Sequence, residues 1–222
     1  MYDYLQRFRK HFPNRKFFQL IDKVYETKNL EESWKKVKDN KGCAGVDEQS
    51  ISDFQKQSEM YLREIQRVLK SRTYKSMPTL RKLIPKDKNN MRPLGIPTVK
   101  DRIVQQATKQ VIEQIFEMKF LDCSYGYRPN KNAHQAIKEI KTAIQQGYNW
   151  VIDADVEKFF DSVNHRMLMN LIAEEISDGN VLNLVETWLK AGVMNQGQQE
   201  ETLMGTTSRR GHLTITCKYL SA

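Results

Sequence analysis

The chain has 222 residues, of which 28% are charged and 39% are hydrophobic. This length allows one large domain or two small ones around a sizeable hydrophobic core. Lys and Arg exceed Asp and Glu by 36 to 27, and the net charge of +9 predicts an anionic partner such as nucleic acid. No apolar run approaches the roughly 20 residues that a membrane span needs, so we expect no membrane partner.

The cytoplasm is the expected compartment. The first residues, Met1 to Lys10, lack the apolar centre and the small-residue cleavage site of a signal peptide. Cys43, Cys123 and Cys217 form an odd set without metal-ligand spacing, which suits a reducing environment without disulfides.

Residues 1–30 form a basic N-terminal extension in which cations alternate with aromatic side chains. That mixture fits phosphate contacts combined with base stacking. An amphipathic helix that packs on the next domain explains the same residues equally well. Both interpretations stay open on the sequence.

Helical periodicity dominates residues 31–147. Apolar residues that recur every three or four positions predict core-facing helices over 51–69, 103–116 and 133–146. Thr98 and Asp101 form a start signal for the second of these helices. Two extended segments, 80–85 and 91–97, are joined by a polar turn, and the prolines of the second keep it extended.

Residues 150–156 alternate between apolar and polar side chains. The apolar set is Trp150, Ile152, Ala154 and Val156. This alternation predicts a strand with one buried face. Aspartate is uncommon in strands, so Asp153 and Asp155 on the other face indicate a metal, a cap or a turn. An ordinary strand with solvated carboxylates is the alternative. Helical patterns resume at 167–172 and 181–189.

Several segments occur in the order in which the reverse transcriptases encoded by group II introns carry their sequence blocks. They are Asn40-Lys-Gly-Cys-Ala-Gly-Val-Asp47, Ile84-Pro-Lys86 with Arg92-Pro-Leu-Gly-Ile-Pro97, Tyr125-Gly-Tyr-Arg-Pro129, and Asp155-Val-Glu-Lys-Phe-Phe-Asp161. The chain resembles this family over about residues 30–205. The resemblance implies an α+β fold, with mostly helical fingers over 31–147, a small antiparallel sheet, and an incomplete palm over 148–205.

The chemistry implied by the resemblance is nucleotidyl transfer assisted by Mg²⁺, which prefers oxygen ligands and stabilises charge on the attacking and leaving oxygens. Asp155 aligns with a catalytic metal ligand, and the backbone carbonyl of Val156 adds a contact. Asp153 is the weaker candidate, better explained as a solvated or capping carboxylate. Lys86 and Arg92 align with residues that grip the triphosphate of an incoming deoxynucleotide. An ordinary basic hairpin is the alternative for these two cations.

The same resemblance implies which residues contact the sugar of the nucleotide and which contact the template. Phe160 aligns with the aromatic residue that lies under the ribose and excludes a 2′-hydroxyl. The residues expected along the path of the RNA template and DNA primer are Arg102, Tyr125, Tyr127 and Arg128. Asp161 and His165 are expected to cap the helix that follows.

The tail, residues 206–222, departs from the family. It is compatible with the family's next motif read in another frame of the same DNA, so a frameshift is our hypothesis, which the gene sequence tests. The paired catalytic aspartates of the family lie beyond this point. We therefore expect a truncated chain that is inactive alone and marginally stable, with an uncovered sheet edge and apolar surface.

The sequence thus predicts the fingers and partial palm of an RNA-directed DNA polymerase that copies group II intron RNA into DNA with Mg²⁺ and aids splicing. A non-catalytic, maturase-like module that binds intron RNA is the alternative from a different class. A reverse transcriptase of another bacterial retroelement is a third interpretation.

Overall fold

The structure, a computed structural model, describes residues 7, 11–12, 15–85, 90–156, 159–201 and 204–205. The expectations for Lys86, for part of the N-terminal extension and for the tail at 206–222 lie outside these residues.

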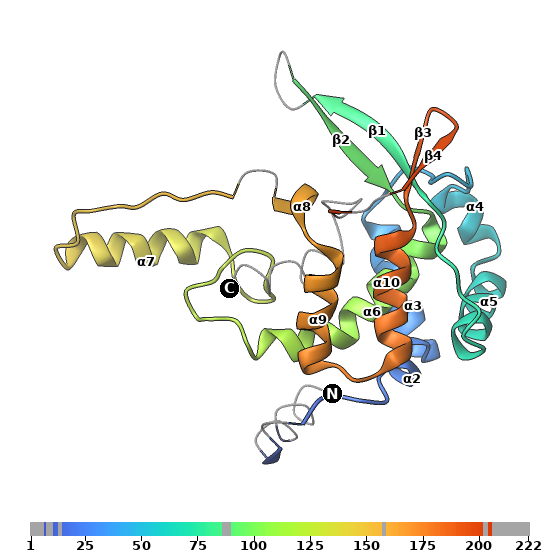
Figure 1. Cartoon of the computed structure of the whole chain (residues 1–222), viewed down its shortest axis with the longest axis horizontal. Coiled ribbons are helices and arrows are strands. Elements are labelled where there is room, and N and C mark those ends of the chain that lie inside the picture. The colour runs from blue at the N-terminus through green and yellow to red at the C-terminus, as the bar shows by residue number, and fades with distance from the viewer. Residues whose placement is uncertain are drawn as a thin grey trace.

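Helices form about half of the described chain, and a small sheet projects from them (Figure 1). The helices are α2 (Ile21–Val24), α3 (Thr27–Asp39), α4 (Ile51–Lys56), α5 (Ser58–Lys70), α6 (Val99–Glu117), α7 (Ala133–Gln145), α8 (Phe159–Ser162), α9 (His165–Glu175) and α10 (Gly179–Lys190). The strands are β1 (Thr79–Pro85), β2 (Met91–Ile96), β3 (Val193–Asn195) and β4 (Gln198–Glu200). The predicted α+β class is confirmed. None of the described helices combines the length and the apolarity of a membrane span.

Helix α6 is the centre of the hydrophobic core. Its side chains Ile103, Ala107 and Ile115 have no exposed surface, and α2 and α3 pack against it. A helix that is apolar around most of its circumference must be covered on most sides. The predicted start at Thr98 is confirmed, because the Thr98 hydroxyl accepts a hydrogen bond from the Asp101 amide at 3.0 Å.

The sheet has the strand order β2-β1-β3-β4. The pairs β1–β2 and β3–β4 are antiparallel, as expected, whereas β1 and β3 are parallel. The sheet is therefore mixed rather than purely antiparallel. Parallel neighbours need a long crossover, and here the whole chain from β2 to α10 makes that connection.

A buried carboxylate joins the base of β1 to the helices. Asp101 Oδ1 accepts a hydrogen bond from the Tyr74 hydroxyl at 2.5 Å, and Asp101 Oδ2 accepts from the Thr98 hydroxyl at 2.8 Å and the Met77 amide at 3.2 Å. The Trp188 indole of α10 donates to the Tyr74 oxygen at 3.1 Å. Burial raises the pKa of Asp101 and holds the pKa of Tyr74 well above its usual value. This network therefore fixes α6, α10 and the segment before β1 together.

Replacing Tyr74 with Phe should remove one donor to Asp101 and the acceptor of Trp188. A buried polar group left without its partner costs about 1–3 kcal/mol, so we expect a loss of that size in the free energy of unfolding. Urea denaturation measures it. Tyr61→Phe is the control, because Tyr61 packs against Phe54 as a ring contact. Equal losses in the two variants would contradict the role of the Tyr74 hydroxyl.

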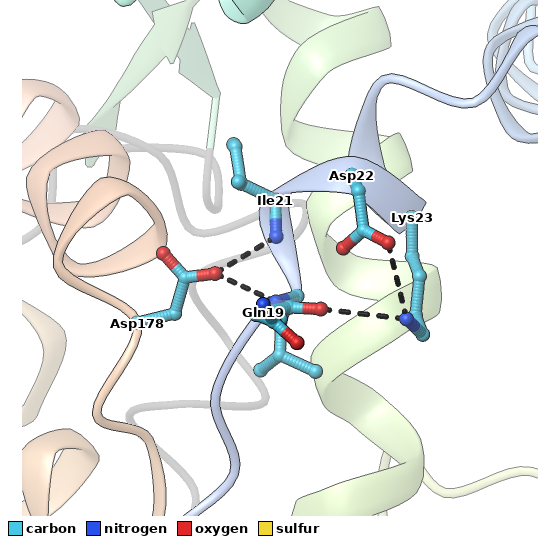
Figure 2. A network of polar contacts seen from close by, with 6 residues as sticks. Gln19, Ile21, Asp22, Lys23 and Asp178 are labelled. Carbon is cyan, nitrogen blue, oxygen red and sulfur yellow. Dashed lines mark hydrogen bonds and ion pairs between the residues drawn. The ribbon is translucent and has the colours of Figure 1, made fainter.

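A second carboxylate attaches the N-terminal segment to the turn between α9 and α10. Asp178 Oδ2 accepts from the amides of Leu20 at 2.6 Å and Ile21 at 2.9 Å (Figure 2). Its other oxygen, Oδ1, caps α10 by accepting from the Asn180 and Val181 amides. One side chain thus satisfies the free amides at the starts of two helices.

A short β-bridge reinforces this attachment. The Phe17 amide donates to the Glu175 carbonyl at 2.7 Å, and the Ser177 amide donates to the Phe17 carbonyl at 2.8 Å. The Phe17 ring is buried in the same core as α9 and α10. Residues 17–24 are therefore part of the folded body.

The strand predicted at 150–156 is wrong for this structure. The segment is irregular, and Trp150 and Ile152 are 96% and 94% exposed. A strand needs a neighbour that pairs its backbone groups, and none of the described strands pairs with this segment. Helix α7 forms as predicted and is ended by Gly147, but it buries none of its residues. Its apolar stripe of Ile137, Ile140 and Ile144 is exposed.

Truncating this stripe should hardly affect stability. We expect Ile140→Ala to change the free energy of unfolding by no more than about 0.5 kcal/mol, as for other surface positions. The matched change Ile103→Ala in α6 should cost about 2–5 kcal/mol, because it leaves a cavity. Urea denaturation compares the two, and binding of a hydrophobic dye should fall only in Ile140→Ala. A large loss of stability in Ile140→Ala would show that α7 is packed.

Candidate nucleotide and template site

The β1–β2 ribbon carries cations on one of its faces. Residues that are paired across antiparallel strands share a face. The register pairs Ile84 with Arg92 and Lys82 with Leu94, so Lys82 and Arg92 lie on the same side as diagonal neighbours. Such neighbours are about 7–8 Å apart, within the span of a polyphosphate. Lys86, predicted beside Arg92, lies outside the described residues.

Lys82 is a candidate that the sequence analysis missed. The side chains of the first extended segment alternate between the two faces of the ribbon. Once the position of the polar turn sets the strand register, this alternation places Lys82 on the same face as Arg92. The opposite face differs, because Arg81 there forms an ion pair with Glu200 of β4 at 2.8 Å. Among the described residues, Lys82 and Arg92 form no ion pair with an acidic side chain. The exposed Lys82 and half-buried Arg92 are therefore available to an anion.

The loop 40–47 is held against the start of α6 by Arg102. Its Nη2 donates to the Cys43 carbonyl at 2.5 Å. Burial lowers the pKa of Arg102, and the nearby Asp47 opposes that shift. A Cβ at Gly42 would lie 2.1 Å from Arg102 Nη1, and one at Gly45 would lie 2.7 Å from Thr98 Cα. Arg102, predicted on the template path, thus also orders this loop.

Gly45→Ala should displace the loop, because its new methyl group meets backbone that cannot rotate away. Overpacking of this kind costs about 1–3 kcal/mol. Thermal unfolding measures the loss. Gly179→Ala is the matched control, since nothing lies within 4 Å of a Cβ at that position. A Gly45→Ala protein as stable as the control would mean that the loop does not approach α6 this closely.

The loop 121–130 uses Arg128 for internal contacts. Its Nη2 pairs with Glu117 at 2.7 Å, and its Nη1 donates to the Leu121 carbonyl at 2.6 Å and the Ser124 carbonyl at 2.9 Å. Only 6% of the Arg128 side chain is exposed. The guanidinium therefore organises the loop, and little of it is open to a template.

The two tyrosines of this loop differ in accessibility. Tyr125 donates a hydrogen bond to Glu139, which raises the Tyr125 pKa, and Lys131 Nζ lies 5.0 Å from the centre of its ring. Tyr127 is 71% exposed. Among the side chains predicted on the template path, Tyr127 is the one whose ring is most open to stacking with a base.

Asp155 and Val156 lie in the exposed segment that leads to α8, so the Asp155 carboxylate is open to solvent. The carboxylate and the Val156 carbonyl are oxygen donors, the kind that Mg²⁺ prefers, and they fit part of its coordination shell. The described residues contain no cluster of three or more His, Cys, Asp or Glu that could hold a metal ion. Substrate phosphates and water would have to supply the remaining ligands.

Phe160 on α8 is half-buried, and its ring meets that of Phe159 edge to face at 5.3 Å. Both rings pack against the core, as expected for Phe159. Figure 1 shows the β1–β2 ribbon projecting from the body in one direction and α7 in another. Within the described chain, Asp155 and Arg92 are joined by neither a hydrogen bond nor an ion pair.

The predicted caps of α9 are wrong. Asn164 is the N-cap, and its side chain accepts from the Met167 amide at 3.1 Å. Asp161 belongs to α8, and His165 is the first residue of α9, where its ring contacts Gly205 instead. Asparagine is as good a cap as aspartate, and it immediately precedes the helix.

Comparisons with known proteins show the family to which the sequence is similar. The sequence matches the family described as reverse transcriptase (RNA-dependent DNA polymerase) over residues 84–210. Protein YkfC of Escherichia coli is 33% identical over 191 residues, which cover 83% of this chain and 50% of that protein. The group II intron-encoded protein LtrA of Lactococcus lactis is 36% identical over 170 residues, which cover 75% of this chain and 28% of LtrA. The chain thus spans half or less of the length of these relatives.

The chain is also similar in sequence to an intron maturase and similar in fold to a solved structure. Nuclear intron maturase 1 of Arabidopsis thaliana is 34% identical over 94 residues, which cover 42% of this chain and 13% of that protein. A chain of a partial Cas6-RT-Cas1–Cas2 complex superposes with a TM-score of 0.53 at 20% identity, covering 91% of this chain and 34% of that chain. The second similarity is one of fold.

Proposed function

Because this chain belongs to the reverse transcriptase family, we propose that it forms the fingers and partial palm of an RNA-directed DNA polymerase of the group II intron type. The resemblance to group II intron-encoded proteins is confirmed by LtrA and by the intron maturase among its relatives. The observation that carries the proposal is the family match over 84–210, which includes β2 with Arg92, the segment with Asp155, and α8 with Phe160. We also propose that the protein acts in the cytoplasm.

The proposed nucleotide site combines residues from the β1–β2 ribbon, the segment 150–156 and α8. Lys82 and Arg92 neutralise the triphosphate of a deoxynucleotide, with Lys86 as a third cation. Asp155 and the Val156 carbonyl hold Mg²⁺, which when bound stabilises charge on the attacking and leaving oxygens. The Phe160 ring lies under the sugar and leaves no room for a 2′-hydroxyl.

The proposed path of the RNA template and DNA primer follows the loops around α6. Tyr127 offers an exposed ring for base stacking, and Tyr125 lies beside it in the same loop. Arg102 contributes positive charge where the loop 40–47 meets α6. Arg128 supports the path by holding the shape of its loop, because its N–H groups already donate to Glu117 and to the Leu121 and Ser124 carbonyls.

A second candidate function is a non-catalytic module that binds intron RNA and aids its splicing. The observation that favours it is that Asp155 belongs to no cluster of three or more His, Cys, Asp or Glu residues within the described chain. One carboxylate does not hold the two Mg²⁺ ions that in-line transfer uses. The net charge of +9 supports binding of RNA under either proposal.

Filter binding and primer extension separate the two functions. We expect this polypeptide alone to bind RNA, with an affinity that falls as salt rises by a log–log slope of about −0.7 for each phosphate contact. RNA binding without measurable extension of a primer would favour the non-catalytic module. Extension that disappears in Asp155→Ala and persists in the control Asp153→Ala would instead identify a self-sufficient polymerase. Failure to bind RNA at low salt would contradict both functions.

A further inference from the structure

Gly205 is held at both of its backbone polar groups, by Val163 in the turn between α8 and α9 and by His165 at the start of α9. Its amide donates to the Val163 carbonyl at 2.9 Å. Its carbonyl accepts from the Nε2 of His165 at 2.7 Å. Because a carbonyl oxygen only accepts, the proton of this bond belongs to His165 Nε2.

The approach at Gly205 is close enough to exclude a side chain. Gly205 is buried and has a φ of +80°, a conformation that favours glycine. A Cβ there would lie 2.7 Å from the Asp161 carbonyl oxygen and 2.9 Å from Asp161 Cα. The backbone of Gly205 is thus in direct contact with α8, at the residue that follows Phe160.

His165 is free to make this contact because the start of α9 is satisfied without it. The Asn164 side chain caps the helix, and the neighbouring Val163 is buried in the core. The half-buried His165 ring therefore acts on Gly205 rather than on its own helix.

We propose that His165 is a positioning residue of the nucleotide site. Its ring fixes Gly205 against the backbone of Asp161, the residue of α8 that follows Phe160. The inference rests on the proposed function, because it assigns His165 to the site in which Phe160 contacts a deoxynucleotide. It gives His165 no step in the chemistry.

Two substitutions isolate the hydrogen bond. His165→Leu replaces the imidazole with an apolar side chain that has no hydrogen-bond donor. His165→Gln offers an amide N–H that can reach the same carbonyl. His134→Leu is the matched control, since His134 lies on the exposed surface of α7.

Amide exchange at Gly205 reads the contact through local opening, because the motion that breaks the hydrogen bond from the Gly205 amide to Val163 also separates the Gly205 carbonyl from His165. The chain has 10 glycines, so a protein labelled with ¹⁵N-glycine gives few signals, and that of Gly205 is the one absent in Gly205→Ala. We expect exchange at Gly205 to accelerate about fivefold in His165→Leu, the factor that corresponds to one neutral hydrogen bond. His165→Gln and His134→Leu should retain the wild-type rate. An unchanged rate in His165→Leu would overturn the proposal.

Titration with a deoxynucleoside triphosphate and Mg²⁺ tests the consequence. We expect the dissociation constant to rise about fivefold in His165→Leu. The dissociation constant for the deoxynucleotide should return to the wild-type value in His165→Gln. The affinity for RNA should be the same in all of these variants. Faster exchange at Gly205 without a change in nucleotide affinity would overturn the positioning role. A wild-type protein that binds no deoxynucleotide would overturn both the proposed function and the role of His165 in the nucleotide site. This outcome can be told apart from a failure of the His165 proposal alone, because amide exchange tests the Gly205 contact independently of nucleotide binding.

Discussion

The arrangement of the ribbon on the helical body depends on the buried carboxylate of Asp101. This side chain receives hydrogen bonds from the segment that enters β1 and from the cap of α6, and through Tyr74 it reaches α10. A charge in such a place is tolerated only because its partners are complete. The direction in which β1 and β2 leave the body, and therefore the position of Lys82 and Arg92, is set at this point.

Much of the fold was predictable because local patterns and tertiary contacts agree. The apolar spacing around Ile103 specified α6, the Thr98 hydroxyl specified its start, and Pro93 with the following Pro97 kept β2 extended. The segment 150–156 shows the opposite case. Its alternation is a property of the sequence, but a strand is a property of two neighbouring segments. Without a paired neighbour, Trp150 and Ile152 stay in solvent. The parallel pairing of β1 with β3 joins residues too far apart for a local pattern to reveal.

The sequence predicted which types of residue form the candidate site. It did not predict which of their side chains are free of partners within the protein and can bind a ligand. Sequence marks an arginine as a binder of phosphate, but it does not show which acceptors the guanidinium already has. Arg128 is taken by Glu117 and two carbonyls, whereas Arg92 has no such partner among the described residues. Lys82 was overlooked for the converse reason, since its face follows from strand register and not from a motif. The contact between His165 and Gly205 spans 40 positions, a separation that no local pattern encodes.

The double cap at Asp178 has a mechanical consequence. Because one carboxylate begins both α2 and α10, neither helix start can separate from the other without leaving backbone amides of both unsatisfied. Loads applied to the chain ahead of Phe17 are thus transmitted to the α9–α10 pair, and through Trp188 and Tyr74 they also reach the segment that enters β1.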